Sequence, residues 1–313
     1  MNELLHVSTS PHIRQNVSTQ SIMRDVCIAL LAPTAFGVYN FGFYALLIVV
    51  ICVASCVVSE WAFEKITHRP VTISDLSAVV TGMILALNLP PAVPLWIPVI
   101  GGVFAIIVVK QLFGGIGQNF MNPALAARVF LLISFAAIMT DYSVPGTAYD
   151  TVSSATALTA LKAHQPIDLW RVVLGTIPGS IGETSTIALA IGAAYMLIRR
   201  VIGWRIPVIY IGTFAIIALF YSHFDFYWTL CEICAGGLFF GAFYMANDYV
   251  THPLTPLGHY IYAVFLGVLT AVFRFCGNSV EGVSYAIILG NVVTPVIERF
   301  TLPRAFGKER DRK

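Results

Sequence analysis

The sequence predicts an all-α polytopic membrane protein with about ten transmembrane helices, some of them broken, in two inverted five-helix repeats. Three observations support this: the composition, the placement of the basic residues and a similarity between the two halves of the chain. Hydrophobic residues make up 58% of the 313 residues and charged residues only 11%, whereas soluble domains are roughly 45–50% apolar. Because each helical crossing takes about 20 mostly apolar residues, we expect a single integral membrane domain over residues 1–313.

Apolar runs divide the chain into two groups of five predicted crossings. Residues 1–140 hold the first repeat, residues 183–313 hold the second, and residues 141–182 form a loop between them. The segments 76–89 and 123–140 are short or interrupted by glycine and polar residues, so we expect half-helices or helices buried in protein, where irregular backbone is tolerated. The predicted crossings are 23–40, 42–59, 76–89, 93–112, 123–140, 183–198, 206–222, 229–246, 259–275 and 281–298.

The basic residues predict the orientation. With the amino terminus in the cytoplasm, ten crossings leave only Lys162, Arg171 and Arg274, of 18 lysines and arginines, away from cytoplasmic ends. Cytoplasmic enrichment of this kind is the positive-inside rule. It supports an even number of crossings with both termini cytoplasmic, and it places the 141–182 loop on the outer face.

The two halves carry similar stretches in the same order. GMILALN ends at Asn88 and GAFYMAN ends at Asn247, and in each half a crossing then ends in a basic residue and a glycine-rich turn. Lys110 precedes QLFGGIGQN, and Arg274 precedes FCGNSVEG. An odd number of crossings per repeat inverts the second copy, which would put Lys110 inside and Arg274 outside. Inverted repeats build midplane sites from discontinuous helices in transporters; chance similarity between glycine-rich membrane turns is the alternative.

The first glycine-rich turn is a candidate binding element. Its backbone amides, and those of the helix start after Asn122, could receive an anionic or polar ring system, because helix starts carry unpaired donors and partial positive charge. Close helix packing through small residues is the alternative. The candidate residues are Gly114, Gly115, Gly117 and Asn119.

The stretch DTVSSATAL, residues 150–158, is polar in a largely apolar chain. Ser153 or Ser154 would cap a helix in which apolar residues follow at helical spacing from Ala157. A capped surface helix does not require a hydroxyl at Thr156. A threonine hydroxyl is a poor nucleophile, so covalent chemistry at Thr156 would need activation by another group.

DTVSSATAL resembles the flavinylation sequence of the NqrB/RnfD family, in which the threonine at the position of Thr156 carries FMN through a phosphoester bond. Ser154 stands where that family usually has glycine. The similarity covers nearly the whole chain, and the short amino terminus is closer to the RnfD branch. The other similar stretches are KQLFGGIGQNFMNPALAARVFLL, PGSIGETSTIALAIGAAYMLI, GGLFFGAFYMANDYVTHPLTPLG and EGVSYAIILGNVVTPVIERF.

The resemblance implies an electron-transfer role. A separate flavin transferase, using FAD and magnesium, would esterify Thr156. The flavin would serve the Rnf complex, an ion-translocating (Na⁺ or H⁺) ferredoxin:NAD⁺ oxidoreductase of the bacterial cytoplasmic (inner) membrane, whose other subunits and lipid would be the partners, without nucleic acid. Riboflavin is implied as a second, noncovalent flavin. The candidate flavin-site residues are Thr156, its recognition residues Asp150, Ser153, Ser154 and Ala155, and, as contacts to FMN or its neighbours, the GGIGQN turn and Arg128.

Acidic residues near or within the membrane are candidates for ion coupling, because burying charge in lipid is costly and usually marks a pathway or a partner. Asp248 and Glu281 are the candidates for cation coupling. Asp75 and Glu183 fit equally well as acids at helix starts, stabilised by the helix dipole. For all four, a structural role remains the alternative.

A small-solute channel or carrier without a redox role is the competing function. Ten crossings in two inverted repeats suit such a protein equally well. A covalent flavin is the feature that separates the two.

Overall fold

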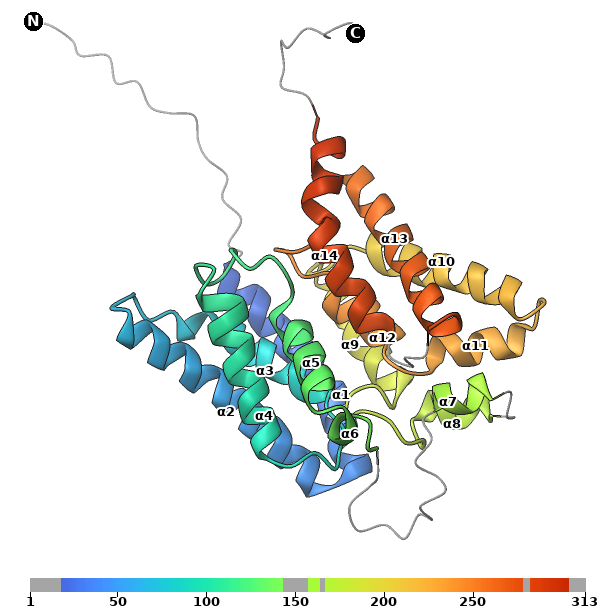
Figure 1. Ribbon diagram of the computed structural model, residues 1–313, viewed down its shortest axis with the longest axis horizontal. Helices are drawn as coiled ribbons and strands as arrows, with labels where there is room; N and C mark the ends of the chain where they lie inside the picture. Colours follow the sequence, from blue (N-terminus) through green and yellow to red (C-terminus); the bar gives the residue numbers. More distant parts are fainter. Residues whose placement is uncertain (1–17, 143–156, 164–166, 278–281, 304–313) are drawn as a thin grey trace, which may run out of the picture.

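The computed structural model describes residues 18–142, 157–163, 167–277 and 282–303, and the regular structure of these ranges is helical throughout (Figure 1). In chain order the elements are α1 (Thr19–Phe41), α2 (Phe43–Ile66), the short η1 (Ile73–Asp75), α3 (Ser77–Leu87), α4 (Trp96–Val103), η2 (Phe104–Gln111), α5 (Pro123–Ser134), α6 (Ala136–Met139), α7 (Ala157–Lys162), α8 (Leu169–Leu174), α9 (Thr186–Ile198), α10 (Arg205–Tyr221), α11 (Phe226–Cys234), α12 (Leu238–Phe240), η3 (Gly241–Met245), α13 (Pro256–Phe275) and α14 (Gly282–Thr301).

Each of the ten predicted crossings coincides with a helix or with consecutive helices. Within the described ranges, 4 helices (α1, α2, α13 and α14) are long and apolar enough to cross a membrane, or 5 spans if α11 and α12–η3, bent by 63°, count as one. The remaining apolar helices are shorter, and α3, with 11 residues, and α5, with 12, agree with the half-helices expected at 76–89 and 123–140. The chain is a polytopic membrane protein.

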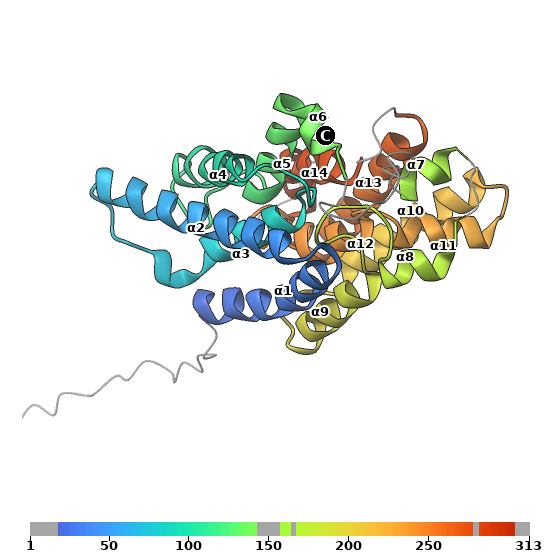
Figure 2. The same ribbon diagram turned by 90° about the horizontal axis from the view of Figure 1, so that it is seen from below.

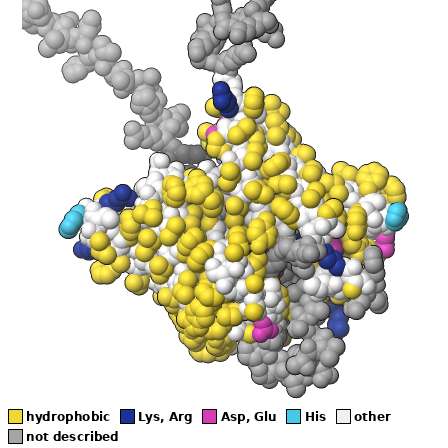
Figure 3. Space-filling model, viewed as in Figure 1, with side chains coloured by type: hydrophobic (Ala, Val, Ile, Leu, Met, Phe, Trp, Pro, Cys, Tyr) yellow, Lys and Arg dark blue, Asp and Glu magenta, His cyan; other side chains and the backbone are white. Residues whose placement is uncertain are grey.

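The outer surface is apolar, as a lipid environment requires. Figure 3 shows hydrophobic side chains over most of the visible face. Among the large exposed side chains, Tyr39 is 85% exposed, Phe43 75% and Ile198 80%. Soluble monomers rarely expose contiguous apolar patches of this kind, so this surface is typical of a membrane protein.

Local sequence signals set the helix starts. Asn122 caps α5 through its side-chain oxygen and is followed by Pro123, which suits the first helical position because it has no N–H to satisfy. Thr255 and Pro256 repeat this arrangement at α13. Ser185 accepts a hydrogen bond from the Ala188 amide at the start of α9, as capping serines do.

The two halves of the chain lie beside each other. Helices α2, α3 and α4 lie on the left of Figure 1, and α10, α11 and α13 lie on the right. Within the halves, α2 packs against α3 and α4, and α10 packs against α13. The halves meet where α1 packs on α9, side by side in Figure 2, and where α5 packs on α14.

The third helix of each half ends in an asparagine that closes its own last turn. Asn88 Nδ2 donates to the Ile84 carbonyl oxygen at 2.6 Å, and Asn247 Nδ2 donates to that of Ala242 at 2.8 Å. These are the two asparagines that ended the similar stretches in the sequence. Asn88 bonds four positions back and Asn247 five positions back, and the internal repeat with its inversion stays a prediction.

Candidate functional site

Next to Thr156, the predicted flavin attachment residue, the structure describes the residues that follow it. The described chain begins again at Ala157, which is the first residue of α7. The predicted residues outside the described ranges are Asp150, Ser153, Ser154, Ala155, Thr156 and Glu281.

Helix α7 is held by an apolar cluster. Ala157, Leu158 and Leu161, the apolar positions at helical spacing, are buried together with Val172 of α8 and Cys231 of α11. The helix therefore has a fixed place at the end of the molecule that carries α6 and α8 (Figure 1).

The junction between α11 and α12 is shaped to receive α7. Gly236 has a φ of +65°, and a Cβ at this position would collide with the side chain of Leu158. Glycine is favoured here twice over, because it adopts positive φ without strain and leaves room for the close approach. Leu158 thus fixes α7 over the break in the α11–α12 span.

A cavity of about 290 Å³, which we call the α7 cavity, opens beside this helix. The Tyr221 and Phe275 rings are stacked, with centroids 4.4 Å apart, and the Trp228 ring lies 5.7 Å from that of Phe275. Stacked aromatic walls suit another flat ring. The cavity is lined by Leu161, Lys162, Tyr221, Trp228, Glu232, Arg274, Phe275, Cys276 and Gly277.

Two cations and one acid line the α7 cavity. Arg274 Nη1 donates to the Glu232 carboxylate at 3.1 Å and to the Glu232 carbonyl oxygen at 2.7 Å, and both side chains are 3% exposed. Lys162 Nζ, which is exposed, donates to the Gly277 carbonyl oxygen at 2.7 Å. The two cations and one carboxylate therefore give the lining residues a net charge of +1.

Two buried N–H groups of the cavity lining lack a hydrogen-bond partner among the described residues. They are Nε of Arg274 and Nε1 of Trp228. Buried donors are normally satisfied, so these two are exceptions in the wall of the cavity. The aromatic walls and the excess positive charge of the lining together fit a planar anion such as a phosphorylated flavin.

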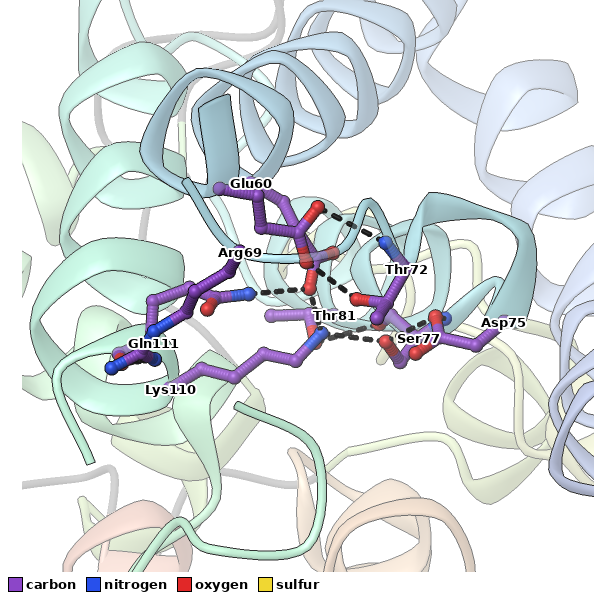
Figure 4. Close-up of polar contacts among 9 residues, drawn as sticks. Glu60, Arg69, Thr72, Asp75, Ser77, Thr81, Lys110 and Gln111 are labelled. Carbon is purple, nitrogen blue, oxygen red and sulfur yellow. Dashed lines mark hydrogen bonds and ion pairs between the residues drawn. The ribbon is translucent and has the colours of Figure 1, made fainter. Parts of the chain in front are cut away.

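A second buried ion pair lies in the first half of the chain (Figure 4). Lys110 Nζ donates to Glu60 Oε1 and to Ser77 Oγ, both at 2.6 Å, and Gln111 Nε2 donates to the same Glu60 oxygen at 2.8 Å. Asp75 Oδ1 accepts from the Ser77 amide at 2.8 Å at the start of α3. The expectation that Asp75 is a helix-start acid is confirmed.

Arg128 joins the two halves. Its Nη1 donates to Asn88 Oδ1 at 2.5 Å, to Glu183 Oε1 at 2.9 Å and to Ser284 Oγ at 3.1 Å. The expectation that Glu183 is a helix-start acid is wrong, because its carboxylate pairs with Arg128 and Ser185 caps α9.

The orientation argument placed Lys110 and Arg128 at cytoplasmic ends, whereas both are buried, at 2% and 3% exposure. Their acidic partners, Glu60 and Glu183, fix their positions. These two cations therefore lend no support to the positive-inside argument.

The GGIGQN turn lies at the end of the molecule opposite α7 (Figure 1). Gly114, Gly115 and Gly117 have φ values of +124°, +95° and +86°, which L side chains rarely adopt, and no atom lies within 4 Å of a Cβ built on Gly117. Backbone conformation, rather than close packing, is thus the reason for these glycines. The structure does not bring them together with α7.

The helix start after the turn offers fewer donors than expected. The Asn122 side chain accepts from the amides of Ala124 and Leu125, at 3.1 and 3.4 Å. These amides are occupied by the helix cap rather than open to a ligand.

Asn119 and Asp248 line a second cavity, of about 100 Å³, which we call the inter-half cavity. Lys110 and Asn122 also line it. Burial raises the pKa of the Asp248 carboxyl, whereas a hydrogen bond from the Val250 amide and the charge of His252 lower it. The structure thus brings together Asn119 and Asp248, which the sequence had assigned to different roles.

Comparison with known proteins agrees with this architecture. The model of the NQR2, RnfD, RnfE family matches residues 6–307. The chain belongs to this family. A family relative in Acetobacterium woodii, the D subunit of the Na⁺-translocating ferredoxin:NAD⁺ oxidoreductase complex, is 49% identical over 100% of this chain and 99% of its own length. The D subunit of the proton-translocating ferredoxin:NAD⁺ oxidoreductase complex of Clostridium ljungdahlii is 40% identical over 97% of this chain and 96% of its own length.

A third relative, the D subunit of the ion-translocating oxidoreductase complex of Halorhodospira halophila, is 36% identical over 99% of this chain and 97% of its own. The names of the three relatives agree on the D subunit of a complex and on ion translocation. The first two name different coupling ions.

In this member of the NQR2, RnfD, RnfE family, the sequence missed Glu60 and Glu232, the acids that pair with Lys110 and Arg274. Lys110 and Arg274 were recognised as equivalent in the two halves. Their acidic partners are not, because Glu60 lies within the unbroken α2 and Glu232 lies on α11, next to the bend before α12. The sequence distance between cation and acid therefore gave no common pattern. The available signal was general, since a carboxylate inside an apolar segment predicts a partner.

Proposed function

We propose that this chain is the membrane electron-transfer subunit of an ion-translocating ferredoxin:NAD⁺ oxidoreductase (Rnf) complex and carries FMN covalently on Thr156. The observation that carries the proposal is the α7 cavity, whose lining includes Leu161, close in sequence to Thr156, and which has aromatic walls and excess positive charge. The relatives' names and the flavinylation-like DTVSSATAL sequence support it. The chain alone does not catalyse the reaction, which needs partner subunits.

The residues around the cavity would bind and orient the flavin. Tyr221, Trp228 and Phe275 offer flat surfaces, and Arg274 and Lys162 offer positive charge. Leu161 lies about 6 Å along the helix axis from Ala157 at 1.5 Å per residue, so the tether and the cavity are close. When bound, FMN supplies the electron-transfer chemistry, while the protein fixes its position and tunes its electronics.

Attachment would take place during maturation. The Thr156 oxygen forms a P–O bond to the FMN phosphate as a flavin transferase splits the FAD pyrophosphate, AMP leaves and the hydroxyl proton is released. Asp150, Ser153, Ser154 and Ala155 are the proposed recognition residues. We place the attachment loop on the outer face of the bacterial cytoplasmic membrane, with both termini in the cytoplasm and lipid around the apolar surface.

The GGIGQN turn is a better candidate for riboflavin, the second flavin that the resemblance implies, than for the tethered FMN. The turn lies at the far end from α7, and its Asn119 lines the inter-half cavity. Arg128 lies between the halves, where it would act on either flavin through its charge. Asp248 and Glu281 stay the proposed ion-pathway residues.

The decisive experiment is a substitution at Thr156. The full chain is produced with a flavin transferase and run on a denaturing gel under ultraviolet light. We expect a fluorescent band for the unsubstituted chain and for Thr151→Ala, and a dark band for Thr156→Ala. Mass spectrometry should locate one FMN, less one water, on the peptide that contains Thr156.

A dark band for the unsubstituted chain would refute the covalent flavin. A solute flux through reconstituted chain without fluorescence would favour the alternative, a small-solute channel or carrier. Fluorescence that persists in Thr156→Ala would move the attachment to another hydroxyl.

A further inference from the structure

We propose that the buried Arg274–Glu232 ion pair sets the reduction potential of the flavin held in the α7 cavity. Arg274 would stabilise the negative charge that the ring system gains on reduction, and Glu232 would hold the guanidinium in place and partly offset its charge. The inference rests on the proposed attachment of FMN to Thr156 and adds to it a role for two residues on α11 and α13.

Arg274 is immobilised from several directions. Nη1 is held by the side chain and backbone of Glu232, and Nη2 donates to the Ala235 carbonyl oxygen at 3.2 Å. The guanidinium carbon lies 5.0 Å from the centroid of the Phe214 ring, a cation–π distance. Of its nitrogens, Nε has no partner among the described residues. The charge is therefore preorganised before any ligand arrives.

Such a charge acts strongly on a neighbouring ring. Charges that are fixed and removed from water interact through a much lower dielectric than those on the surface, and they need no reorganisation when the ligand's charge changes. Arg274 is 2% exposed and lines the cavity. Lys162 also lines it but is exposed, so solvent screens its charge more.

The two members of the pair must act with opposite signs. Removing the positive charge of Arg274 destabilises the reduced, more negative ring and lowers the potential. Removing the negative charge of Glu232 leaves Arg274 less neutralised and raises the potential. A purely structural role would give no such pair of opposite shifts, because either substitution would loosen the same contact.

The test is a redox titration of the covalent flavin in the full chain within its complex, followed by absorbance. We expect Glu232→Gln to raise, and Arg274→Gln to lower, the equilibrium constant for flavin reduction at least tenfold, which is about 30 mV for a two-electron couple. Arg274→Lys keeps the charge and should shift the constant less than Arg274→Gln does. Arg171→Gln, an exposed cation on α8 outside the cavity, is the matched control and should leave it unchanged.

Each outcome decides the matter. Shifts of the same sign in both pair variants, or no shift in a chain that carries its flavin, overturn the inference and leave the proposed function intact. If Arg274→Gln fails to insert into the membrane, the sign of the Glu232→Gln shift alone is decisive, because the isosteric amide can still accept from Arg274. A chain without a fluorescent band on a denaturing gel overturns the proposed function first and this inference with it.

Discussion

Removing Lys110 should destabilise the protein strongly, because it leaves the Glu60 carboxylate buried without its cation. The two charged atoms are 2.6 Å apart, and the side chains are 3% and 0% exposed. Lys110→Met keeps most of the length of the side chain and removes the charge. Gln111 would remain as a neutral hydrogen-bond donor to Glu60.

The magnitude follows from the geometry. Two unit charges at 2.6 Å attract by about 6 kcal/mol at an effective dielectric constant of about 20, and desolvation of both ions offsets part of this. Breaking a buried pair by removing one partner typically costs about 3–5 kcal/mol. We expect a loss of this size in the free energy of unfolding for Lys110→Met, and a similar loss for Glu60→Gln.

A double-mutant cycle is the appropriate assay. Unfolding of the unsubstituted chain, both single variants and the double variant is measured in the same detergent by tryptophan fluorescence. Because the double variant buries no unpaired charge, it should be more stable than the sum of the single losses predicts by about 2 kcal/mol or more, the upper part of the range for coupled neighbours. Single losses that add within about 0.5 kcal/mol would show that the pair does not couple, and would refute the reasoning.

Two further predictions concern packing and ion coupling. A Cβ on Gly82 would lie 2.7 Å from the Cα of Val53, so Gly82→Ala should push α3 from α2 and cost about 1–3 kcal/mol of unfolding free energy, whereas Gly212→Ala on α10, with nothing within 4 Å, should not destabilise the protein. Asp248→Asn should abolish ion transport by the reconstituted complex, measured with a fluorescent ion indicator; Asp225→Asn, which preserves a helix cap, should transport normally. Unchanged ion transport in Asp248→Asn would remove Asp248 from the pathway, and an equally destabilised Gly212→Ala would remove the packing argument.

Much of the fold could be predicted because it depends on local pattern. Apolar runs located every predicted crossing on a helix, and interrupted runs at 76–89 and 123–140 indicated the short helices α3 and α5. The apolar spacing from Ala157 predicted a helix there, and the structure shows that Ala157, Leu158 and Leu161 of α7 are buried. The lengths of the spans were less predictable, since α9 covers only 13 residues and α11–α12 is sharply bent.

The site was predictable only where it depends on a short stretch of sequence. DTVSSATAL resembles a family's attachment sequence, and that resemblance selects Thr156 without any structure. The cavity wall is different, because its residues come from α7, α10, α11 and α13. Glu183 shows the same limit: beside a predicted helix it looked like a helix-start acid, but it pairs with an arginine 55 residues away.

The sequence by itself determined that this chain crosses a membrane many times, which stretches form helices, and which family it resembles. Composition and short-range periodicity are sufficient for these, because the solvent and the backbone act on neighbouring residues. The tertiary structure alone decided which charges meet. Lys110 pairs with Glu60, 50 positions away in the sequence, and Arg274 pairs with Glu232, 42 positions away. An unpaired charge in an apolar interior is costly, so each buried cation needs an acidic partner. Only the packing of the helices decides which acid that is.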